Sequence, residues 1–218
     1  MNHFLQANRS LWDAWTDEHE KSQFYDLPAF RAGKDRLRSI ELAELGDLPG
    51  KSLLHLQCHF GLDTMGWARR GAIVTGVDLS PRSIALAQSL SRELNIPCRF
   101  ICSDIYDLPD NLSGEFDIVF CSYGVLHWLP DLYGWAAVVV RFLRPGGVFY
   151  IVDDHPFFRS LTANSTRDLL VANPYFFSPQ PDRVEMEGSY ATKGGGENRT
   201  FYIWNHPLGE VISSIIDS

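Results

Sequence analysis

An acidic residue, Asp78, stands at the end of an apolar run that is typical of a buried strand, residues 72–77. A tight turn at residues 58–61 follows an earlier apolar run in the same way. An acid at the end of the second strand can accept hydrogen bonds from both hydroxyls of a ribose, while the first turn holds the rest of a nucleotide-like ligand. These positions predict a site for an adenosine-containing cofactor.

The elements that must position these residues alternate along the chain. We expect strands at 52–57, 72–77, 98–102, 116–121 and 147–153, with helices at 62–70, 81–94 and 131–143. Strands that are apolar throughout suit a parallel sheet covered on both faces. Alternating βαβ units with short loops indicate an α/β fold with a doubly wound, mainly parallel sheet.

The segments outside this alternation divide one domain into four parts. Residues 1–48 are expected to form an N-terminal helical cap, and residues 49–155 the α/β core. Residues 156–206 form an insert over the substrate, with a hairpin from strand-like runs at 183–190 and 199–204. Residues 207–218 complete the chain as a final amphipathic helix.

Composition argues against several classes of protein. The formal charge of −8, with no basic cluster longer than Arg69 and Arg70, argues against a nucleic-acid partner. No apolar run approaches the roughly 20 residues that a membrane span needs, and the N-terminus lacks a signal-peptide pattern. The four cysteines include no CxxC pair, which favours reduced thiols in a cytoplasmic protein over disulfides or a metal site.

Four motifs follow one another in order. They are LLHLQCHFG at 53–61, VTGVDLS at 74–80, FICSDIYDLP at 100–109, and FDIVFCSYGVLHWLPD at 116–131 followed by FLRPGGVFYIVDD at 142–154. Over residues 50–155 the chain resembles the class I S-adenosylmethionine-dependent methyltransferases of the small-molecule type, in particular a subgroup with an LHLQCHFG first motif. The resemblance implies S-adenosylmethionine as cofactor, in-line transfer of its methyl group to a small organic acceptor, and S-adenosylhomocysteine as product.

The resemblance also assigns roles to cofactor-binding residues. Asp78 would bind the ribose hydroxyls, although an acid there could instead cap the helix that begins near Pro81. Asp104 would receive the adenine amino group, or would be an ordinary turn acid. The backbone and side chain of Ile105 would contact one face of the ring and Leu79 the other. The rest of the predicted cofactor-binding set is His55, Gln57, Cys58, Gly61, Ser103 and Ser122.

The first motif departs from the family pattern of acid-x-Gly-x-Gly-x-Gly. His55 takes the place of the acid, Gln57 and His59 replace two glycines, and Gly61 remains. A dinucleotide site needs GxGxxG to bring a helix N-terminus to the pyrophosphate, and His59 with Phe60 leaves little room for it. The departure therefore counts against an NAD-dependent oxidoreductase, which stays a second alternative behind a non-catalytic or truncated cofactor-binding module.

The predicted site for the methyl acceptor consists of aromatic residues and one histidine. His127 follows the fourth strand, where it is either a general base or a histidine that binds the backbone of its own loop. Tyr123 and Trp128 would form a wall that excludes water and stabilises the sulfonium. With Tyr25 and Tyr202 they make up the predicted substrate-binding set.

The end of the chain leads to a further expectation. The resembling fold has strand order 3-2-1-4-5-7-6, and its last two strands follow a final helix. Here the sequence stops directly after the helix, which predicts a sheet of five parallel strands with 147–153 at an open edge. An unpaired edge favours association, so we expect low stability or a homodimer.

Overall fold

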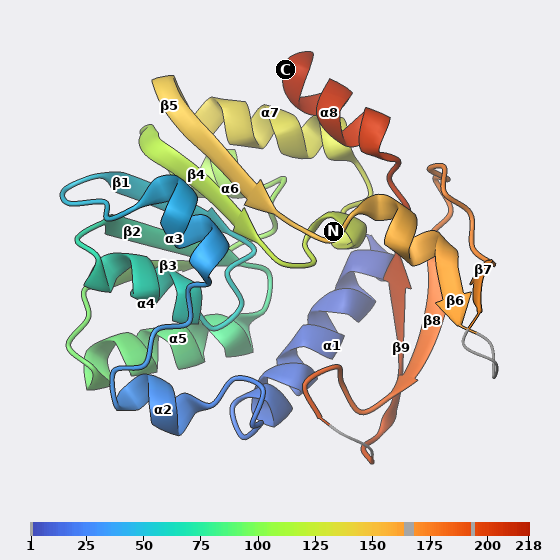
Figure 1. Cartoon of the computed structure of the whole chain (residues 1–218), viewed down its shortest axis with the longest axis horizontal. Helices are drawn as coiled ribbons and strands as arrows, with labels where there is room; N and C mark the ends of the chain where they lie inside the picture. The colour runs from blue at the N-terminus through green and yellow to red at the C-terminus, as the bar shows by residue number, and fades with distance from the viewer. Residues whose placement is uncertain (1, 164–167, 193–194) are drawn as a thin grey trace.

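The computed structural model describes residues 2–163, 168–192 and 195–218. Its central sheet has five parallel strands in the order β3-β2-β1-β4-β5 (Figure 1). The strands are β1 (Ser52–Leu56), β2 (Ile73–Asp78), β3 (Cys98–Cys102), β4 (Phe116–Ser122) and β5 (Leu143–Val152). The doubly wound α/β class expected from the sequence is therefore confirmed, and so is the place of β5 at the edge.

Helices cover both faces of this sheet. The helices of the core are α4 (Leu62–Arg69), α5 (Pro81–Glu93), α6 (Leu108–Asn111) and α7 (Leu132–Phe142), followed at the C-terminal end by α8 (Leu208–Ile216). On one face, Met65 of α4 packs in a buried cluster with Ile84 of α5. On the other face, Trp135 and Phe142 of α7 are fully buried in a cluster that α8 also contacts. Figure 1 shows the two helical layers on either side of the strands.

The register brings the carboxyl ends of the middle strands together. His55 on β1 lies opposite Gly76 on β2 and opposite Phe120 on β4. Chain order reverses at β1, because β2 and β4 flank it on opposite sides. Ligands of open α/β sheets bind in the crevice outside the strand ends at such a reversal.

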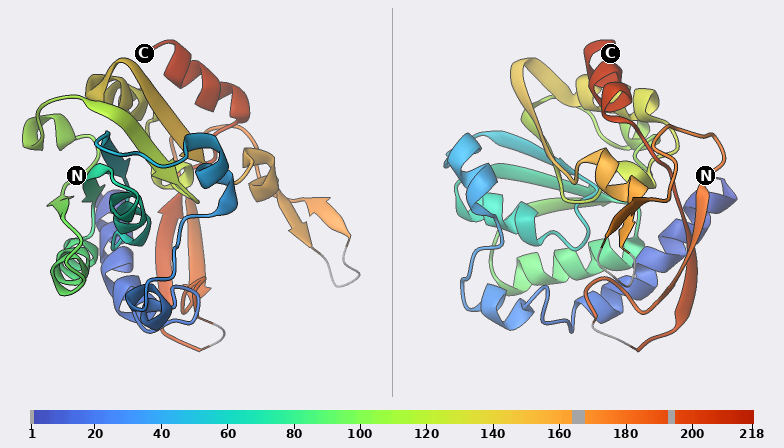
Figure 2. Two further views of the ribbon diagram at one scale, coloured as in Figure 1. Left: turned by 60° about the vertical axis from the view of Figure 1, so that its left-hand side comes forward. Right: turned by 45° about the vertical axis from the view of Figure 1, so that its right-hand side comes forward.

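The N-terminal segment and a hairpin form a cap beside these strand ends. The cap consists of α1 (His3–His19), α2 (Leu27–Arg31), α3 (Ser39–Leu45), β8 (Asp182–Glu187) and β9 (Asn198–Ile203). Helix α1 lies along β9 (Figure 2) and is joined to it by Asn8, whose side chain donates to the Tyr202 carbonyl over 2.7 Å and accepts from its N–H over 2.9 Å. The hairpin pairs with itself and leaves the β5 edge open, as expected.

Some local structure differs from the expectation. Within the expected helical cap, α3 begins only at Ser39, because Asp35 accepts the Leu37 N–H and Glu41 accepts the Arg38 N–H, which caps the helix there. A second hairpin, β6 (Leu161–Ala163) with β7 (Leu169–Val171), was not expected and projects away from the sheet (Figure 2). Two 3-10 turns, η1 (Leu126–Trp128) and η2 (Pro156–Ser160), complete the described elements. No helix in the described ranges is long and apolar enough to cross a membrane.

Gly76 tests how closely the core is packed behind the first turn. A Cβ at Gly76 would lie 2.8 Å from the Phe100 ring and 2.9 Å from the Cys58 sulfur. We expect Gly76→Ala to lower the free energy of unfolding by about 1–3 kcal/mol through overpacking. Gly209→Ala is the matched control, because a Cβ there meets no described atom within 4 Å and should stabilise α8 by roughly 0.5–1 kcal/mol. Denaturant unfolding of both variants measures the difference, and equal effects would contradict the packing.

Candidate functional site

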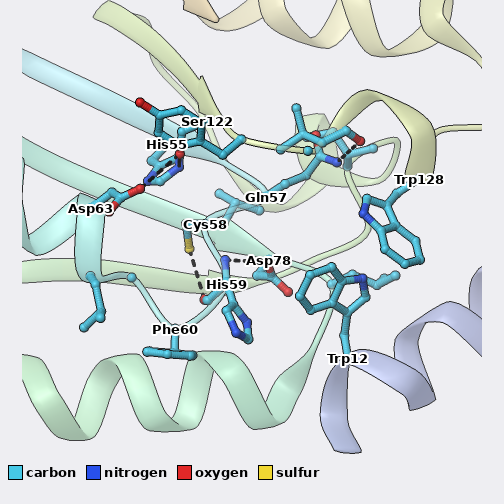
Figure 3. A pocket seen from close by; sticks show the side chains of 18 of the residues that line it. Trp12, His55, Gln57, Cys58, His59, Phe60, Asp63, Asp78, Ser122 and Trp128 are labelled. Atoms are coloured by element: carbon cyan, nitrogen blue, oxygen red, sulfur yellow. Dashed lines mark hydrogen bonds between the residues drawn. The ribbon is translucent and has the colours of Figure 1, made fainter. Parts of the chain in front are cut away.

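A cavity of about 210 Å³ opens at the carboxyl ends of β1, β2 and β4 (Figure 3). Every residue of the predicted cofactor-binding set lines it, together with three of the predicted substrate residues. The lining residues that the sequence predicted are Tyr25, His55, Gln57, Cys58, Gly61, Asp78, Leu79, Ser103, Asp104, Ile105, Ser122, Tyr123 and Trp128. The structure thus gathers into one cavity residues that lie up to a hundred positions apart.

The turn after β1 has a left-handed backbone at three positions. Gln57 has a φ of 57°, His59 of 52° and Gly61 of 75°. Gly61 is required on two counts, since a Cβ there would also lie 2.5 Å from the Phe100 ring. At the other two positions a side chain replaces the expected glycine. The Gln57 amide donates to the Val125 carbonyl over 3.1 Å, so contacts outside the turn help to hold this backbone.

Asp78 stands at the end of β2 with its carboxylate at the cavity. Its Oδ2 accepts the His59 N–H over 2.7 Å, and its Oδ1 accepts the Ser80 N–H over 2.9 Å. Burial raises the pKa of this carboxyl to about 6. The helix start is capped by Ser80, whose hydroxyl accepts the Ser83 N–H over 3.0 Å. Ser80 is therefore the N-cap of α5, while Asp78 bonds the backbone directly before the helix and lines the cavity.

The end of the cavity beside Asp63 is polar, and the sequence predicted only some of its residues. Ser122 donates to Asp63 Oδ2 over 3.2 Å, and its hydroxyl lies 3.3 Å from His55 Nε2. Burial raises the pKa of Asp63 to about 6, while the nearby guanidinium of Arg36 opposes that shift. Two buried atoms here, Gln57 Oε1 and Arg36 Nε, have no hydrogen-bond partner in the described part of the chain.

Several lining residues escaped the sequence reasoning. They are chiefly Trp12, Arg36, Arg38 and Asp63. Asp63 could have been found from its place two residues after Gly61, at the start of α4, where acids are favoured. The two arginines carry no such signal, because a basic run before a helix is usually a solvated surface.

Aromatic rings close the cavity on the cap side. Trp12 of α1 and Trp128 lie edge to face with centroids 5.2 Å apart. The hydroxyls of Tyr25 and Tyr190 are 2.5 Å apart, which joins the N-terminal segment to the loop after β8. Tyr123 donates to Glu41 over 2.7 Å, which fixes its ring at the rim.

Two predicted residues do not reach this cavity. His127 lines a second, smaller cavity beside Asp153, Arg159 and His206, and burial, with the nearby positive charge of Arg159, lowers its pKa well below the usual value. Successive residues of a 3-10 turn point about 120° apart, so η1 directs the Trp128 ring to the main cavity and the His127 ring away from it. The residue that the sequence offered as a general base, or as a histidine bonding its own loop, thus lies outside the lining of the main cavity.

Tyr202 was also misplaced. Its ring packs edge to face on Phe4 with centroids 4.8 Å apart, and its backbone pairs with Asn8. The whole of β9 lies outside the cavity lining, and its buried ring, Phe201, packs instead against Leu11 and Trp15 of α1. The Tyr202 side chain holds α1 on the hairpin, outside the cavity lining.

Comparison with known proteins agrees with this geometry. Residues 54–151 match the methyltransferase domain family. An uncharacterised methyltransferase of Synechocystis is 34% identical over 125 residues, which cover 56% of this chain and 56% of that protein. A ubiquinone biosynthesis O-methyltransferase of Alkalilimnicola ehrlichii is 32% identical over 161 residues, covering 73% of this chain and 58% of that protein. The chain therefore spans less than two thirds of the length of these relatives.

A solved structure shares the fold. An S-adenosylmethionine-dependent methyltransferase from Mesorhizobium loti superposes with a TM-score of 0.60 at 22% sequence identity. The superposition covers 80% of this chain and 76% of that one. At this identity the likeness concerns the arrangement of the strands and helices.

The buried imidazole of His55 makes folding sensitive to acid. Its Nδ1 lies 2.8 Å from the Thr64 hydroxyl, and burial lowers its pKa from 6.5 to about 3. Between pH 7 and pH 5 the unfolded chain binds a proton at this residue that the folded chain does not, so stability falls with falling pH by roughly 2 kcal/mol. The raised pKa values of Asp63 and Asp78 change the stability in the opposite sense as the pH falls. Their effect is the same in the unaltered protein and in a variant that retains both acids, so it cancels when the two are compared.

We therefore expect His55→Gln to lose roughly 2 kcal/mol less stability than the unaltered protein between pH 7 and pH 5. Denaturant unfolding at the two pH values measures this difference. Equal losses in both proteins would show that His55 titrates normally in the folded state.

Proposed function

We propose that the chain, whose residues 54–151 match the methyltransferase domain family, transfers a methyl group from S-adenosylmethionine to a small organic acceptor. The observation that carries the proposal is the carboxylate of Asp78 at the end of β2, held by two backbone N–H groups with its face to the cavity. A carboxylate so held can accept hydrogen bonds from both ribose hydroxyls.

The adenosine half of the cofactor lies, in this proposal, between β2 and β3. Asp104 accepts the Tyr106 N–H at Oδ1 over 3.2 Å, which leaves Oδ2 for the adenine amino group. Ile105 and Leu79 offer apolar surface to the two faces of the ring, and Ser103 lines the same end. Trp12 of α1 covers the ribose from the cap side.

The methionine half extends toward Asp63 and Arg36. An amino acid carries an ammonium and a carboxylate, and this end of the cavity offers an acid and a guanidinium side by side. Gln57 Oε1 and Arg36 Nε, which have no partner among the described residues, can accept from the ammonium and donate to the carboxylate, respectively. His55 and Ser122 complete this end, together with the turn at Cys58 and Gly61.

Catalysis then rests on alignment. The sulfonium is already a reactive methyl donor, so in-line approach of the acceptor supplies most of the acceleration. The faces of Trp128 and Tyr123 can stabilise the cationic sulfonium and exclude water. With Tyr25 they form a mostly aromatic wall for the acceptor. A base is needed only where the acceptor must lose a proton.

An oxygen atom is the acceptor atom that we propose, because the relatives include proteins named ubiquinone biosynthesis O-methyltransferases. The aromatic lining suits a flat, partly apolar acceptor such as a phenol. Incubation with S-adenosylmethionine and parallel sets of phenols, carboxylic acids and amines, followed by release of S-adenosylhomocysteine, tests this. Turnover of amines alone would contradict the oxygen acceptor, and binding without turnover of any acceptor would favour a non-catalytic module.

The cofactor itself is tested by ligand-induced stabilisation. A ligand at 100 times its dissociation constant stabilises the folded state by about 2.7 kcal/mol. We expect S-adenosylmethionine and S-adenosylhomocysteine to raise the melting temperature, and NAD and NADP to leave it unchanged, because His59 and Phe60 occupy the space of a pyrophosphate loop. Stabilisation by NAD alone would favour the oxidoreductase alternative.

We also propose a homodimer and a cytoplasmic location. Within the described residues β5 pairs only with β4, and Val148 on this edge strand is 46% exposed. Such an edge can pair with a second copy, which analytical ultracentrifugation tests. All four cysteines are free thiols, as is usual in a reducing compartment.

The role of Asp78 can be tested by removing its carboxylate. We expect Asp78→Ala to weaken S-adenosylhomocysteine binding by about 2–4 kcal/mol, because hydrogen bonds from both ribose hydroxyls to a charged acceptor are lost. Titration calorimetry measures this, with the melting temperature as a check on folding. Glu115→Ala removes an exposed acid outside the cavity and serves as the matched control. Unchanged affinity in a folded Asp78→Ala protein would refute the ribose contact.

His127 should be dispensable for the chemical step. We expect His127→Ala to keep turnover within about tenfold of the unaltered protein, short of the roughly 10²–10⁴-fold loss that removal of a general base causes. The reason is that its imidazole lines the second cavity. Steady-state kinetics on the acceptor found above measure the effect. A loss of a thousandfold with an unchanged melting temperature would restore His127 as the base.

A further inference from the structure

A chain of side-chain hydrogen bonds joins α1 to the turn that follows β1. The Thr16 hydroxyl bonds the Trp12 carbonyl over 2.7 Å and the Ser83 hydroxyl over 2.7 Å. Ser83 in turn lies 2.9 Å from His59 Nδ1, and His59 Nε2 lies 2.9 Å from His19 Nδ1. Helices α1 and α5 thus contact the same residue of the turn. Figure 3 shows the His59 side chain extending from the turn toward the helices.

The donors and acceptors of this chain can have only one order. A carbonyl only accepts, so Thr16 donates to Trp12, and Ser83 must then donate to Thr16. The Ser83 hydroxyl has one proton, which it donates to Thr16, and it therefore accepts from His59 Nδ1–H. The neutral ring of His59 is bare at Nε2, which accepts from His19 Nδ1–H. Burial holds both rings neutral by lowering the pKa of His19 to about 3 and that of His59 well below its usual value.

His59 also links this series of hydrogen bonds to the proposed cofactor site. His59 has a left-handed backbone, a conformation that a side chain disfavours by crowding the carbonyl oxygen. In this conformation its N–H donates to Asp78 Oδ2 over 2.7 Å. Because both ring nitrogens of His59 are hydrogen-bonded, the ring holds the backbone of this residue in place. The His59 N–H in turn holds the Asp78 carboxylate.

His19 itself is fully buried and lies outside the cavity lining. Its ring stacks between Trp15, at a centroid distance of 5.8 Å, and Tyr25, at 5.0 Å. Packed in this way, it presents Nδ1 to His59 in one direction only. Any effect of His19 on a ligand in the cavity must therefore pass through a neighbour.

We propose that His19 is a positioning residue for the cofactor: it holds His59 in the left-handed conformation that aims the Asp78 carboxylate at the ribose. This inference rests on the proposed function, since Asp78 is assigned there to the ribose. It explains how a turn without the usual glycines presents the same acid. It also makes docking of α1 a condition for tight binding of the cofactor.

The test uses variants that separate the hydrogen bond from the packing. His19→Phe keeps an aromatic ring between Trp15 and Tyr25 but removes the donor, whereas His19→Asn places an amide N–H close to the position of Nδ1. Each is made with His59 present and again with His59→Gly, because glycine adopts a left-handed backbone without help. Ser22→Ala, which removes a hydrogen bond to the His19 carbonyl, is the matched control on the same segment.

Calorimetry with S-adenosylhomocysteine gives the readout, with the melting temperature measured in parallel. We expect His19→Phe to weaken binding roughly tenfold, and His19→Asn to restore most of that loss. In the His59→Gly background we expect His19→Phe to cause no further loss. Ser22→Ala should bind as the unaltered protein does.

Three results would overturn the inference. Unchanged affinity in His19→Phe would show that the hydrogen bond does not position the turn. A tenfold loss that persists in the His59→Gly background would show that His19 acts through the packing of α1. Failure of the unaltered protein to bind S-adenosylhomocysteine would overturn the proposed function as well, and only that result would do so. If His19→Phe fails to fold, Ser83→Ala breaks the chain from α5, and the same comparison with and without His59→Gly decides the question.

Discussion

The turn between β1 and α4 is the constraint on which the rest of the site depends. Left-handed backbone costs roughly 1–2 kcal/mol at a residue that carries a side chain, and this turn uses it at Gln57 and at His59. The turn persists because the Val125 carbonyl, the Asp78 carboxylate and the Ser83 hydroxyl each bond one of these residues. Three separate parts of the chain must therefore be in place before the cavity has its shape.

Burial sets the electrostatics of this cavity. The carboxyls of Asp63 and Asp78 have pKa values raised to about 6, and the imidazole of His55 is neutral because its pKa is lowered to about 3. An environment that disfavours isolated charge gains from a ligand of opposite charge. In the proposed binding mode the ammonium group of S-adenosylmethionine would lie at the Asp63 end of the cavity, and the ribose hydroxyls would donate hydrogen bonds to Asp78. A dinucleotide is disfavoured by the turn itself, because the side chains of His59 and Phe60 stand where a glycine-rich loop would receive the pyrophosphate.

The sequence predicted what local chemistry determines. Continuous apolar strands identified the α/β core, and Asp78 and Gly61, which the sequence singled out at a strand end and in the first turn, both line the cavity. The features that the sequence did not predict depend on the direction in which a side chain points in the folded protein. Trp128 and His127 are neighbours in sequence, and only the 3-10 turn decides which ring enters the cavity. Arg36 lines the cavity from the segment between α2 and α3, a placement that periodicity does not reveal.

The cap is held together by contacts between segments far apart in the sequence, unlike the sheet of the core. Asn8 bonds Tyr202 across 194 positions, and Trp15 donates to the Gly188 carbonyl over 2.9 Å, so the cap closes only when both ends of the chain have folded. It adds no strand to the central sheet, and its release would leave the sheet hydrogen bonds intact. Elements of this kind open at lower free energy than the core does. Because the aromatic wall belongs partly to the cap, entry to the cavity and the alignment of its residues depend on the same contacts.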